Sequence, residues 1–475
     1  MTGILFTSAF LIPLVSGLAV MISGKRIRKA SGVLSLTLTL VSSALIWYAL
    51  LSCPGGSFVL LKASDRFVLS FSCDGASQLF AGLIATLWPL TVIYALEYME
   101  DDERPEMFFG FFLMAFGATA GIAFAGNYFT LYCFYEALTL TTVPLVLHYH
   151  TEESVRAART YFTYSLGGAA MVFLSMLYFT LTPSPGSGAE LAKLFYLAGF
   201  AGFSVKSAVF PLHAWLPRAS VAPTPVTALL HAVAVVKSGV FAVIRLTWCV
   251  YGDLSADDPV RGVLICVVSF SILYGSSMAV RETDLKRRLA YSTVANLSYI
   301  LFGALLMNVS GLAAAFVHML FHAVMKITAF FAAGSVLHAS GRRKVYEMDG
   351  MGRLMPLTFT AFTLAALSLT GVPPFAGFVS KWQLLTAAAE MGGVFAYAGC
   401  ASIIFSALLT AIYMFTTVRR AFFSDAPSLN GTGDPGWRMI LPMALTSVLC
   451  LVMGLAGGFF ADLCMNAAGN MPRWI

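Results

Sequence analysis

The sequence predicts an all-α polytopic membrane protein of about fourteen transmembrane helices, and three observations carry this prediction. Of the 475 residues, 59% are hydrophobic and only 11% are charged, whereas a soluble domain carries roughly 25% charged residues. Apolar runs of ~20 residues, the length that crosses a bilayer, recur along the whole chain. The Lys and Arg residues gather in the short loops between these runs, as they do in membrane proteins.

The individual spans are placed by the length of each apolar run. In order they are predicted at residues 3–22, 31–52, 77–97, 107–125, 127–148, 160–182, 190–216, 225–250, 260–280, 287–307, 311–338, 356–385, 396–418 and 437–462. The first run spans a membrane and is followed by basic residues, so we interpret it as a transmembrane helix and not as a signal peptide. The seventh run is the least regular, because a cluster of prolines ends or breaks it.

The basic residues between the spans predict an orientation. If the amino terminus lies outside, the inside loops hold 19 Lys and Arg, the outside loops hold 5, and five more lie within spans. This bias predicts a multi-pass protein of the cell's inner (plasma) membrane with both termini outside. The net charge of +6 therefore belongs to membrane loops, and we predict no nucleic-acid partner.

The outside segment at residues 57–72 has two β-prone runs around Ser64-Asp65, which predicts a small hairpin. Cys53 and Cys73 flank it, so a disulfide on the oxidising side is one interpretation, and two unrelated apolar cysteines are the other. The eight cysteines include no CxxC pair, so the sequence predicts no cofactor and no metal site built from them.

Span 5 carries Glu136 in its middle, the only carboxylate there. A charge at the centre of a bilayer costs ~2.5–3.5 kcal/mol on insertion scales, so such residues face the bundle interior and usually have a function. A carboxylate buried alone takes up a proton, but a neighbouring lysine keeps it ionised. Lys206 of span 7 is the predicted partner, and separation of the pair would release the lysine proton. The alternative is a purely structural ion pair.

The stretch at residues 202–241 is apolar, yet it holds Lys206, Lys237 and several prolines, among them Pro211. Proline frees backbone groups that neighbours must satisfy, which is how transporters build broken helices around ion paths. Lys237 in span 8 is the next predicted proton site. His231 lies six residues earlier, which places it off to one side of Lys237 on a regular helix, and we interpret it equally as a relay member or as a packed core histidine.

Span 11 places His318, His322 and Lys326 at i, i+4 and i+8, which forms one polar stripe on an apolar helix. Two histidines at this spacing also suit a metal, but the helix has no cysteine or carboxylate and a lysine follows one turn on. A hydrated proton relay is the favoured interpretation, since histidine titrates near neutral pH.

Span 12 has a second break at Pro373-Pro374, and Lys381 follows it. Two broken, lysine-bearing helices five spans apart indicate an inverted repeat, because an odd separation reverses the direction of crossing. The predicted units are residues 1–106 (helices 1–3 and the hairpin), 107–255 (first five-helix repeat), 256–420 (second repeat) and 421–475 (helix 14).

Four motifs between about Gly110 and Arg420 resemble a known family: GFSVKSAVFPLHAWLPRASVAPTPVTALLHAVAVVKSGVF, YEALTLTTVPLV, HAVMKITAFFAAGSVLH and GVPPFAGFVSKW. They are similar to the antiporter-like membrane subunits. These include the proton-pumping subunits of respiratory complex I, the A and D subunits of Mrp cation/proton antiporters and the membrane subunits of energy-converting hydrogenases. The resemblance implies fourteen helices with two inverted five-helix units.

The resemblance also implies roles for single residues. Glu136 and Lys206 match the helix 5 glutamate and its paired helix 7 lysine, and Lys237 matches the helix 8 lysine. The span 11 stripe matches the central hydrated relay, and Lys381 matches the terminal residue of helix 12, which is lysine or glutamate in different members. Lysine at this position and an end soon after span 14 favour an Mrp D-type, hydrogenase-type or compact complex I subunit.

The predicted function is therefore translocation of protons, with Na⁺ as an open alternative, by one subunit of a multi-subunit membrane complex. Its expected partners are other membrane subunits, homologous ones included, and the lipid bilayer. No GxGxxG, flavin or cluster motif is present, so any catalytic site belongs to the assembly. The alternatives are a self-sufficient Na⁺/H⁺ antiporter, or a mainly structural subunit of a hydrogenase or NADH:quinone oxidoreductase.

Overall fold

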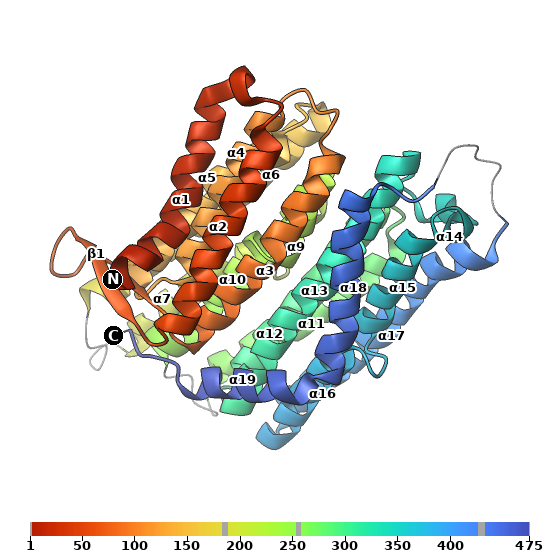
Figure 1. Ribbon diagram of the computed structural model, residues 1–475. Helices are drawn as coiled ribbons and strands as arrows, with labels where there is room; N and C mark the ends of the chain where they lie inside the picture. Colours follow the sequence, from red (N-terminus) through yellow and green to blue (C-terminus); the bar gives the residue numbers. More distant parts are fainter. Residues whose placement is uncertain (1, 183–188, 253–257, 426–432, 475) are drawn as a thin grey trace.

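The computed structural model describes residues 2–182, 189–252, 258–425 and 433–474 (Figure 1). Its helices in the first half are α1 (Thr2–Ser23), α2 (Ser31–Ser52), α3 (Gly75–Tyr98), α4 (Pro105–Ala123), α5 (Tyr128–Leu147), α6 (Glu152–Leu181), α7 (Ala189–Lys206), α8 (Trp215–Arg218), α9 (Thr224–Ala232) and α10 (Val235–Arg245). Those in the second half are α11 (Pro259–Arg281), α12 (Leu285–Leu305), α13 (Val309–Ser340), α14 (Met351–Leu354), α15 (Pro356–Thr370), α16 (Ala376–Met391), α17 (Val394–Phe423), α18 (Trp437–Leu455) and α19 (Gly457–Gly469).

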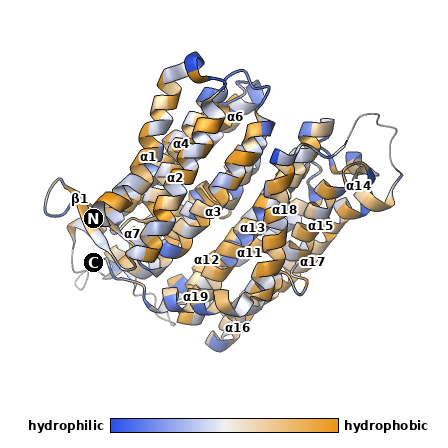
Figure 2. Ribbon diagram, in the orientation of Figure 1, coloured by the Kyte–Doolittle hydropathy of each residue, from blue (hydrophilic) through white to orange (hydrophobic). Residues whose placement is uncertain are grey.

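The helices confirm the predicted class of all-α membrane protein. Within the described residues, eleven helices are long and apolar enough to cross a membrane. The three remaining predicted spans correspond to α7, to α12, which begins with a basic cluster, and to the broken pair α15–α16. Figure 2 shows apolar residues along the middle of the bundle and hydrophilic residues at its two ends, the distribution that a bilayer requires.

Side-chain caps set where several helices begin. Asp74, Asn127, Thr151, Asp284 and Asn308 each accept a hydrogen bond from a backbone N–H group in the first turn of α3, α5, α6, α12 and α13. Such caps satisfy donors that have no partner inside the helix. The cap at Thr151 also explains why α6 begins before its predicted start at residue 160, because the first turns carry charged residues outside the apolar run.

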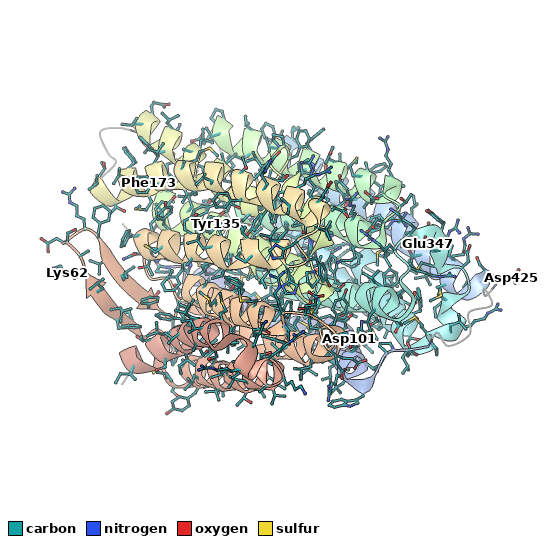
Figure 3. The ribbon with its side chains drawn as sticks, turned by 90° about the horizontal axis from the view of Figure 1, so that it is seen from above. Lys62, Asp101, Tyr135, Phe173, Glu347 and Asp425 are labelled. Atoms are coloured by element: carbon teal, nitrogen blue, oxygen red, sulfur yellow. The ribbon has the colours of Figure 1, made fainter. Side chains whose placement is uncertain are left out.

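The predicted hairpin is confirmed. Strands β1 (Ser57–Lys62) and β2 (Val68–Ser72) pair antiparallel, with Ser57 opposite Ser72. Phe71 of the hairpin stacks on Phe10 of α1 with ring centroids 4.7 Å apart, which holds the hairpin on the bundle. Figure 3, turned by 90°, places Lys62 at one edge of the molecule and Asp425 at the opposite edge. Cys53 and Cys73 lie close enough to interact electrostatically, and their disulfide stays a prediction.

The most buried elements form the centre of the bundle. Helix α13 contacts α3, α9, α12, α15, α16, α18 and α19, and the pair α9–α10 is buried along its whole length. Both chain ends lie at the same end of the bundle (Figure 1), as an even number of crossings requires. The division into two inverted units stays a prediction, and its boundary at residues 255 and 256 lies outside the described residues.

The break between α15 and α16 packs against α18 at Gly454. A Cβ atom at this position would lie 2.0 Å from the carbonyl oxygen of Pro374 and 2.5 Å from the carbonyl carbon of Phe375. Both are backbone atoms, so neither can rotate away. We expect Gly454→Ala to lower the free energy of unfolding by about 1–3 kcal/mol, the usual cost of overpacking, measured by thermal unfolding in detergent.

Gly458 provides the matched control, because a Cβ atom there would meet nothing within 4 Å. Gly458→Ala should change stability by no more than about 0.5 kcal/mol. Equal melting temperatures for the two variants would show that the contact at Gly454 does not limit the packing of this break.

Candidate functional site

The first predicted pair, Glu136 and Lys206, lies where α5 meets the end of α7. The two residues interact electrostatically, but among the described residues no ion pair within 4.0 Å joins them. The Lys206 ammonium instead donates to the carbonyl oxygen of Tyr135, and it sits 3.3 Å from the centroid of the Tyr135 ring. The Glu136 Oε1 atom is buried without a hydrogen-bond partner. The structure therefore holds the pair as separated neighbours.

The break that was predicted after Lys206 is present. Helix α7 ends at Lys206, and regular helix resumes only at α8. The Trp215 indole N–H donates to the carbonyl oxygen of Val205 at 2.7 Å, and the backbone N–H of Phe210 donates to Ser271 Oγ at 3.1 Å. Backbone groups that the break frees thus find partners inside the protein, as an irregular segment within a membrane must.

Span 8 is also broken, which sequence reasoning missed. Helix α9 ends at Ala232 and α10 begins at Val235, so Lys237 lies in the first turn after the break. The prolines nearby start α9 and do not cause this break, and the only sequence signal is a run of β-branched valines, which weaken a helix slightly. The predicted placement of His231 to one side of Lys237 on one helix therefore does not apply, because the two residues lie on different helices.

The polar stripe on α13 is buried and connects to both neighbouring breaks. His318, His322 and Lys326 have no measurable exposure. The Lys237 ammonium forms a hydrogen bond with His322 Nδ1, and the rings of His322 and His318 lie 5.8 Å apart between centroids, nearly parallel. His318 Nδ1 is 2.9 Å from the hydroxyl of Ser380, the residue before Lys381. Direct contacts thus run from Lys237 across α13 to α16.

Lys381 completes this row at the break between α15 and α16. Its ammonium donates to the carbonyl oxygens of Leu369 at 2.6 Å and Thr370 at 2.8 Å. These belong to the last turn of α15, where carbonyl groups have no partner inside the helix and carry partial negative charge. Pro373 and Pro374 follow that turn, so the predicted break creates the carbonyl site that receives the lysine.

Lys326 and His231 lie beside the row and not in it. The Lys326 ammonium donates to the carbonyl oxygen of Leu289 in α12 at 3.0 Å. The His231 ring stacks on Phe330 with centroids 4.7 Å apart, and both of its nitrogens are buried without a hydrogen-bond partner. Of the eight predicted site residues, four form the connected row, these two flank it, and Glu136 and Lys206 form a separate group.

Backbone carbonyls take the place of carboxylates beside these lysines. Lys206, Lys326 and Lys381 each donate to a carbonyl oxygen, and within the described residues none of them forms an ion pair. A carbonyl dipole stabilises an ammonium less than a full negative charge does, while burial penalises the charge. The arrangement therefore suits groups that give up and regain a proton, more than groups that hold a fixed charge.

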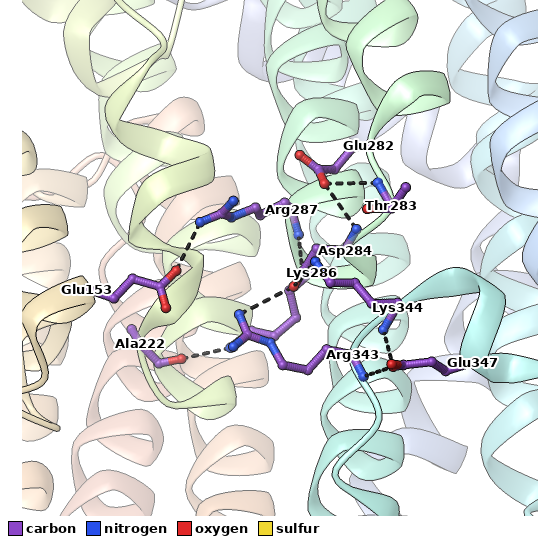
Figure 4. Close-up of polar contacts among 10 residues, drawn as sticks. All are labelled: Glu153, Ala222, Glu282, Thr283, Asp284, Lys286, Arg287, Arg343, Lys344 and Glu347. Atoms are coloured by element: carbon purple, nitrogen blue, oxygen red, sulfur yellow. Dashed lines mark hydrogen bonds and ion pairs between the residues drawn. The ribbon is translucent and has the colours of Figure 1, made fainter.

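Sequence reasoning also missed several buried cations at the end of the bundle that carries the basic loops. Lys286, expected in a loop, is buried and donates to the carbonyl oxygen of Ala222 at 2.8 Å. Around it, Arg287 pairs with Glu153 at 3.0 Å and Arg343 pairs with Asp284 at 3.3 Å (Figure 4). These contacts tie α6, α12 and the segment after α13 together, and nothing in the local sequence distinguishes them from solvated loop charges.

In this loop network, the backbone N–H groups of Lys344 and Arg343 donate to Glu347 Oε2 (Figure 4). The N–H of Lys344 has the larger effect, and the two together hold the pKa of the Glu347 carboxylate below its ordinary value. Within the described residues, no group of three or more His, Cys, Asp or Glu side chains is arranged so that it could hold a metal ion. The histidine pair of α13 instead contacts a lysine and a serine.

Residues 125–410 match the family model described as NADH:quinone oxidoreductase/Mrp antiporter, transmembrane. The chain belongs to this family. The match confirms the resemblance predicted for the region from about Gly110 to Arg420, and it makes the protein an antiporter-like membrane subunit.

Individual relatives agree with the family assignment. The antiporter-like subunit is 33% identical over 403 residues to NADH-quinone oxidoreductase subunit N of Desulforudis audaxviator, covering 78% of this chain and 79% of the relative. Its fold matches a chain of the Mrp complex from Dietzia sp. with a TM-score of 0.84 at 23% identity, covering 98% and 97% of the two chains. It matches a chain of an archaeal membrane-bound sulfane sulfur reductase with a TM-score of 0.87 at 23% identity, covering 99% and 98%.

Proposed function

We propose that this chain moves protons along its buried Glu, Lys and His side chains, as one subunit of a multi-subunit membrane complex. The observation that carries the proposal is the row of contacts Lys237–His322–His318–Ser380, with Lys381 as the next residue along α16, which links the broken elements α9–α10 and α15–α16 across the middle of α13. Each member is a group that can accept and donate a proton. A structural role alone would not favour burying so many basic groups without carboxylate partners.

In this proposal Glu136 and Lys206 form the entrance. The carboxylate and the ammonium attract each other, but the Lys206 ammonium rests on the carbonyl of Tyr135. When Glu136 approaches, Lys206 is stabilised as the ammonium; when Glu136 withdraws, Lys206 is left desolvated and passes its proton on. Lys237 receives the proton, the two histidines carry it across α13, and Lys381 passes it out.

Several buried polar atoms of the row and its flank have no hydrogen-bond partner among the described residues. They include Nε2 of His318 and His322, both ring nitrogens of His231 and the Thr370 hydroxyl. Buried polar groups in proteins are paired with protein atoms or with water. We therefore place water molecules between Lys206 and Lys237 and along the flank formed by His231 and Lys326.

The driving reaction belongs to other subunits in this proposal. The relatives are named for an NADH-quinone oxidoreductase, an Mrp complex and a sulfane sulfur reductase, so coupling to redox chemistry and to cation antiport are both open. A self-sufficient Na⁺/H⁺ antiporter is disfavoured, since Na⁺ is a hard cation that prefers several oxygen ligands and the described path has one carboxylate. The bias of basic loops supports an orientation with both termini outside the plasma membrane.

Replacing Lys206 tests whether Glu136 and Lys206 form the entrance of the proton path. The complex is purified with its natural partner subunits, reconstituted into vesicles, and energised in turn by NADH with quinone and by an imposed Na⁺ gradient. Lys206→Met keeps the length of the side chain but removes the transferable proton. We expect the rate of coupled proton movement, measured with a pH-sensitive dye, to fall at least tenfold while assembly is unchanged.

Lys193→Met is the matched control on the same helix. Lys193 pairs with Asp258 at 3.2 Å at the far end of α7 and is partly exposed, so its loss should leave proton movement unchanged. Wild-type rates in assembled complexes that carry Lys206→Met would remove Lys206 from the path. Proton movement in the wild-type complex with only one of the two energy sources, NADH with quinone or the Na⁺ gradient, would identify the reaction that drives it.

A further inference from the structure

A cavity of about 850 Å³ lies where α2 and α3 face α13, α18 and α19. These elements are close in space although they come from opposite ends of the chain (Figure 1). Beyond the cavity α3 also packs on α18, and near the far end of α3 the backbone N–H of Gly436 donates to the Glu97 carboxylate at 2.5 Å. The proton path does not use this space, because its residues lie on other faces of the helices.

The wall of the cavity on α3 is a narrow apolar strip. Its members recur every three or four residues from Gly75 to Leu87 and include Gly82 and Leu83. Twelve residues of helix rise about 18 Å, close to the ~15 Å depth of one leaflet's hydrocarbon. Thr86 is exposed although its neighbours on α3 are buried, which shows that this face meets open space. The strip therefore fits one extended acyl chain.

The polar residues of the lining gather where α3 begins. They are Asp74, Gln78, Asn466 and Asn470, with Thr86 as a further hydroxyl near the other end of the strip, and the described lining contains no lysine or arginine. Asp74 Oδ1 accepts hydrogen bonds from Ser77 and Arg245, whereas Asp74 Oδ2 is buried without a partner. An orphaned carboxylate oxygen calls for a hydrogen-bond donor, preferably a positively charged one. The side-chain amides can donate to ester or phosphate oxygens.

The mouth of the cavity opens toward the hydrocarbon of the membrane. Trp47 and Leu51 on α2 and Phe459 and Leu463 on α19 line it and are exposed in the chain by itself. Large exposed apolar side chains are stable against lipid, not against water. The far wall includes Leu320 of α13, two residues from both His318 and His322 and hence on the opposite face of the helix.

We propose that this cavity binds one membrane phospholipid with a primary-amine head group. One acyl chain lies along α3 from Gly75 to Leu87. The ammonium lies against the Asp74 carboxylate, which lines the cavity, and the amides of Gln78, Asn466 and Asn470 face the glycerol and phosphate oxygens. The lipid fills the space behind α13 and joins the start of α3 to α19. Apolar protein cavities of this kind bind apolar ligands and exclude water, so the lipid also keeps this face of α13 dry.

Retention of lipid by the intact complex tests the proposal. The complex is purified with its natural partner subunits in mild detergent, and bound phospholipids are quantified per chain by mass spectrometry. We expect the wild type to retain one aminophospholipid per chain at this site. Thr86→Trp places an indole near the Leu87 end of the strip and should reduce this retention at least fivefold. Leu463→Trp, at the mouth, should do the same and serves if Thr86→Trp does not assemble.

Thr37→Trp is the matched control, because Thr37 is exposed on α2 and does not line the cavity; it should retain lipid like the wild type. The head group is tested on delipidated complex with phosphatidylethanolamine and phosphatidylcholine, whose trimethylated nitrogen has no N–H. We expect a preference for phosphatidylethanolamine of about tenfold, the ratio that one charge-assisted hydrogen bond sustains.

Three outcomes would overturn the proposal. In the first, assembled Thr86→Trp and Leu463→Trp retain wild-type amounts of aminophospholipid. In the second, the two head groups bind equally well. In the third, a helix of a neighbouring subunit fills the cavity in the structure of the complex. None of these outcomes depends on proton movement, so they test the lipid site independently of the proposed function.

Discussion

Replacing Lys237 by alanine is expected to abolish coupled proton movement while the complex still assembles. Lys237 is wholly buried, follows the unpredicted break in span 8, and makes the direct contact with His322 that begins the connected row. Its loss leaves the two histidines of α13 without a proton donor on the side of the proposed entrance. In energised vesicles we expect the initial rate of proton movement to fall at least a hundredfold, which corresponds to about 2.7 kcal/mol of added barrier.

Two variants make this result specific. Lys29→Ala removes a lysine from an exposed loop and should leave the rate unchanged. Lys237→Arg keeps a positive charge but cannot release its proton in proteins, so it should be inactive if proton transfer, and not charge, is what this position provides. Full activity of Lys237→Arg, or of assembled Lys237→Ala, contradicts the proposed path.

Replacing Arg245 by alanine is expected to destabilise the protein more than any exposed substitution. Arg245 is fully buried, pairs with Asp74 at 2.7 Å, donates to Ser77 Oγ at 2.9 Å, and lies between the rings of Phe241 and Trp474. Removal leaves the Asp74 carboxylate largely buried and uncompensated, a loss that costs about 3–5 kcal/mol. Thermal unfolding of the purified protein in detergent, at one scan rate for all variants, measures the effect.

The exposed pair Lys62–Asp65 is the control for the Arg245–Asp74 pair. Its N···O distance is also 2.7 Å, but both of its side chains are exposed to solvent. Lys62→Ala should cost no more than about 1 kcal/mol. The double variant Asp74→Leu with Arg245→Met removes both charges and should recover much of the lost stability. Equal losses for Arg245→Ala and Lys62→Ala would show that burial of the first pair does not matter.

Arg245 also illustrates where sequence reasoning reached its limit. Its position near the end of span 8 permitted snorkelling to the surface, alongside a structural role. The structure shows the guanidinium fully enclosed and bound to Asp74, a residue far away in the sequence. The partner could not be read from the sequence, since the two residues are 171 positions apart and no local pattern links them.

For the predicted site residues, too, the sequence predicted burial but not the partner of each side chain. The apolar surroundings of Lys206, Lys237, Lys326 and Lys381 sufficed to place them inside the membrane, and proline predicted two of the three breaks. Contact between Glu136 and Lys206 was expected from charge alone, yet the Tyr135 carbonyl receives the ammonium. An ammonium needs a nearby acceptor of any kind, and which acceptor is nearest depends on how α5 and α7 pack.

The amino-acid sequence by itself determined the class of fold, the hairpin, the family and the burial of the lysines and histidines predicted for the relay. These features follow from the free energy of transferring apolar and charged groups into a bilayer, which depends on the composition of each short segment by itself. Only the tertiary structure decided that Lys237 follows a break, that four residues form a connected row while His231 and Lys326 flank it, and that a cavity opens behind α13. Those features depend on distances between separate helices, and distances of a few ångströms are decided by packing and not by spacing along the chain.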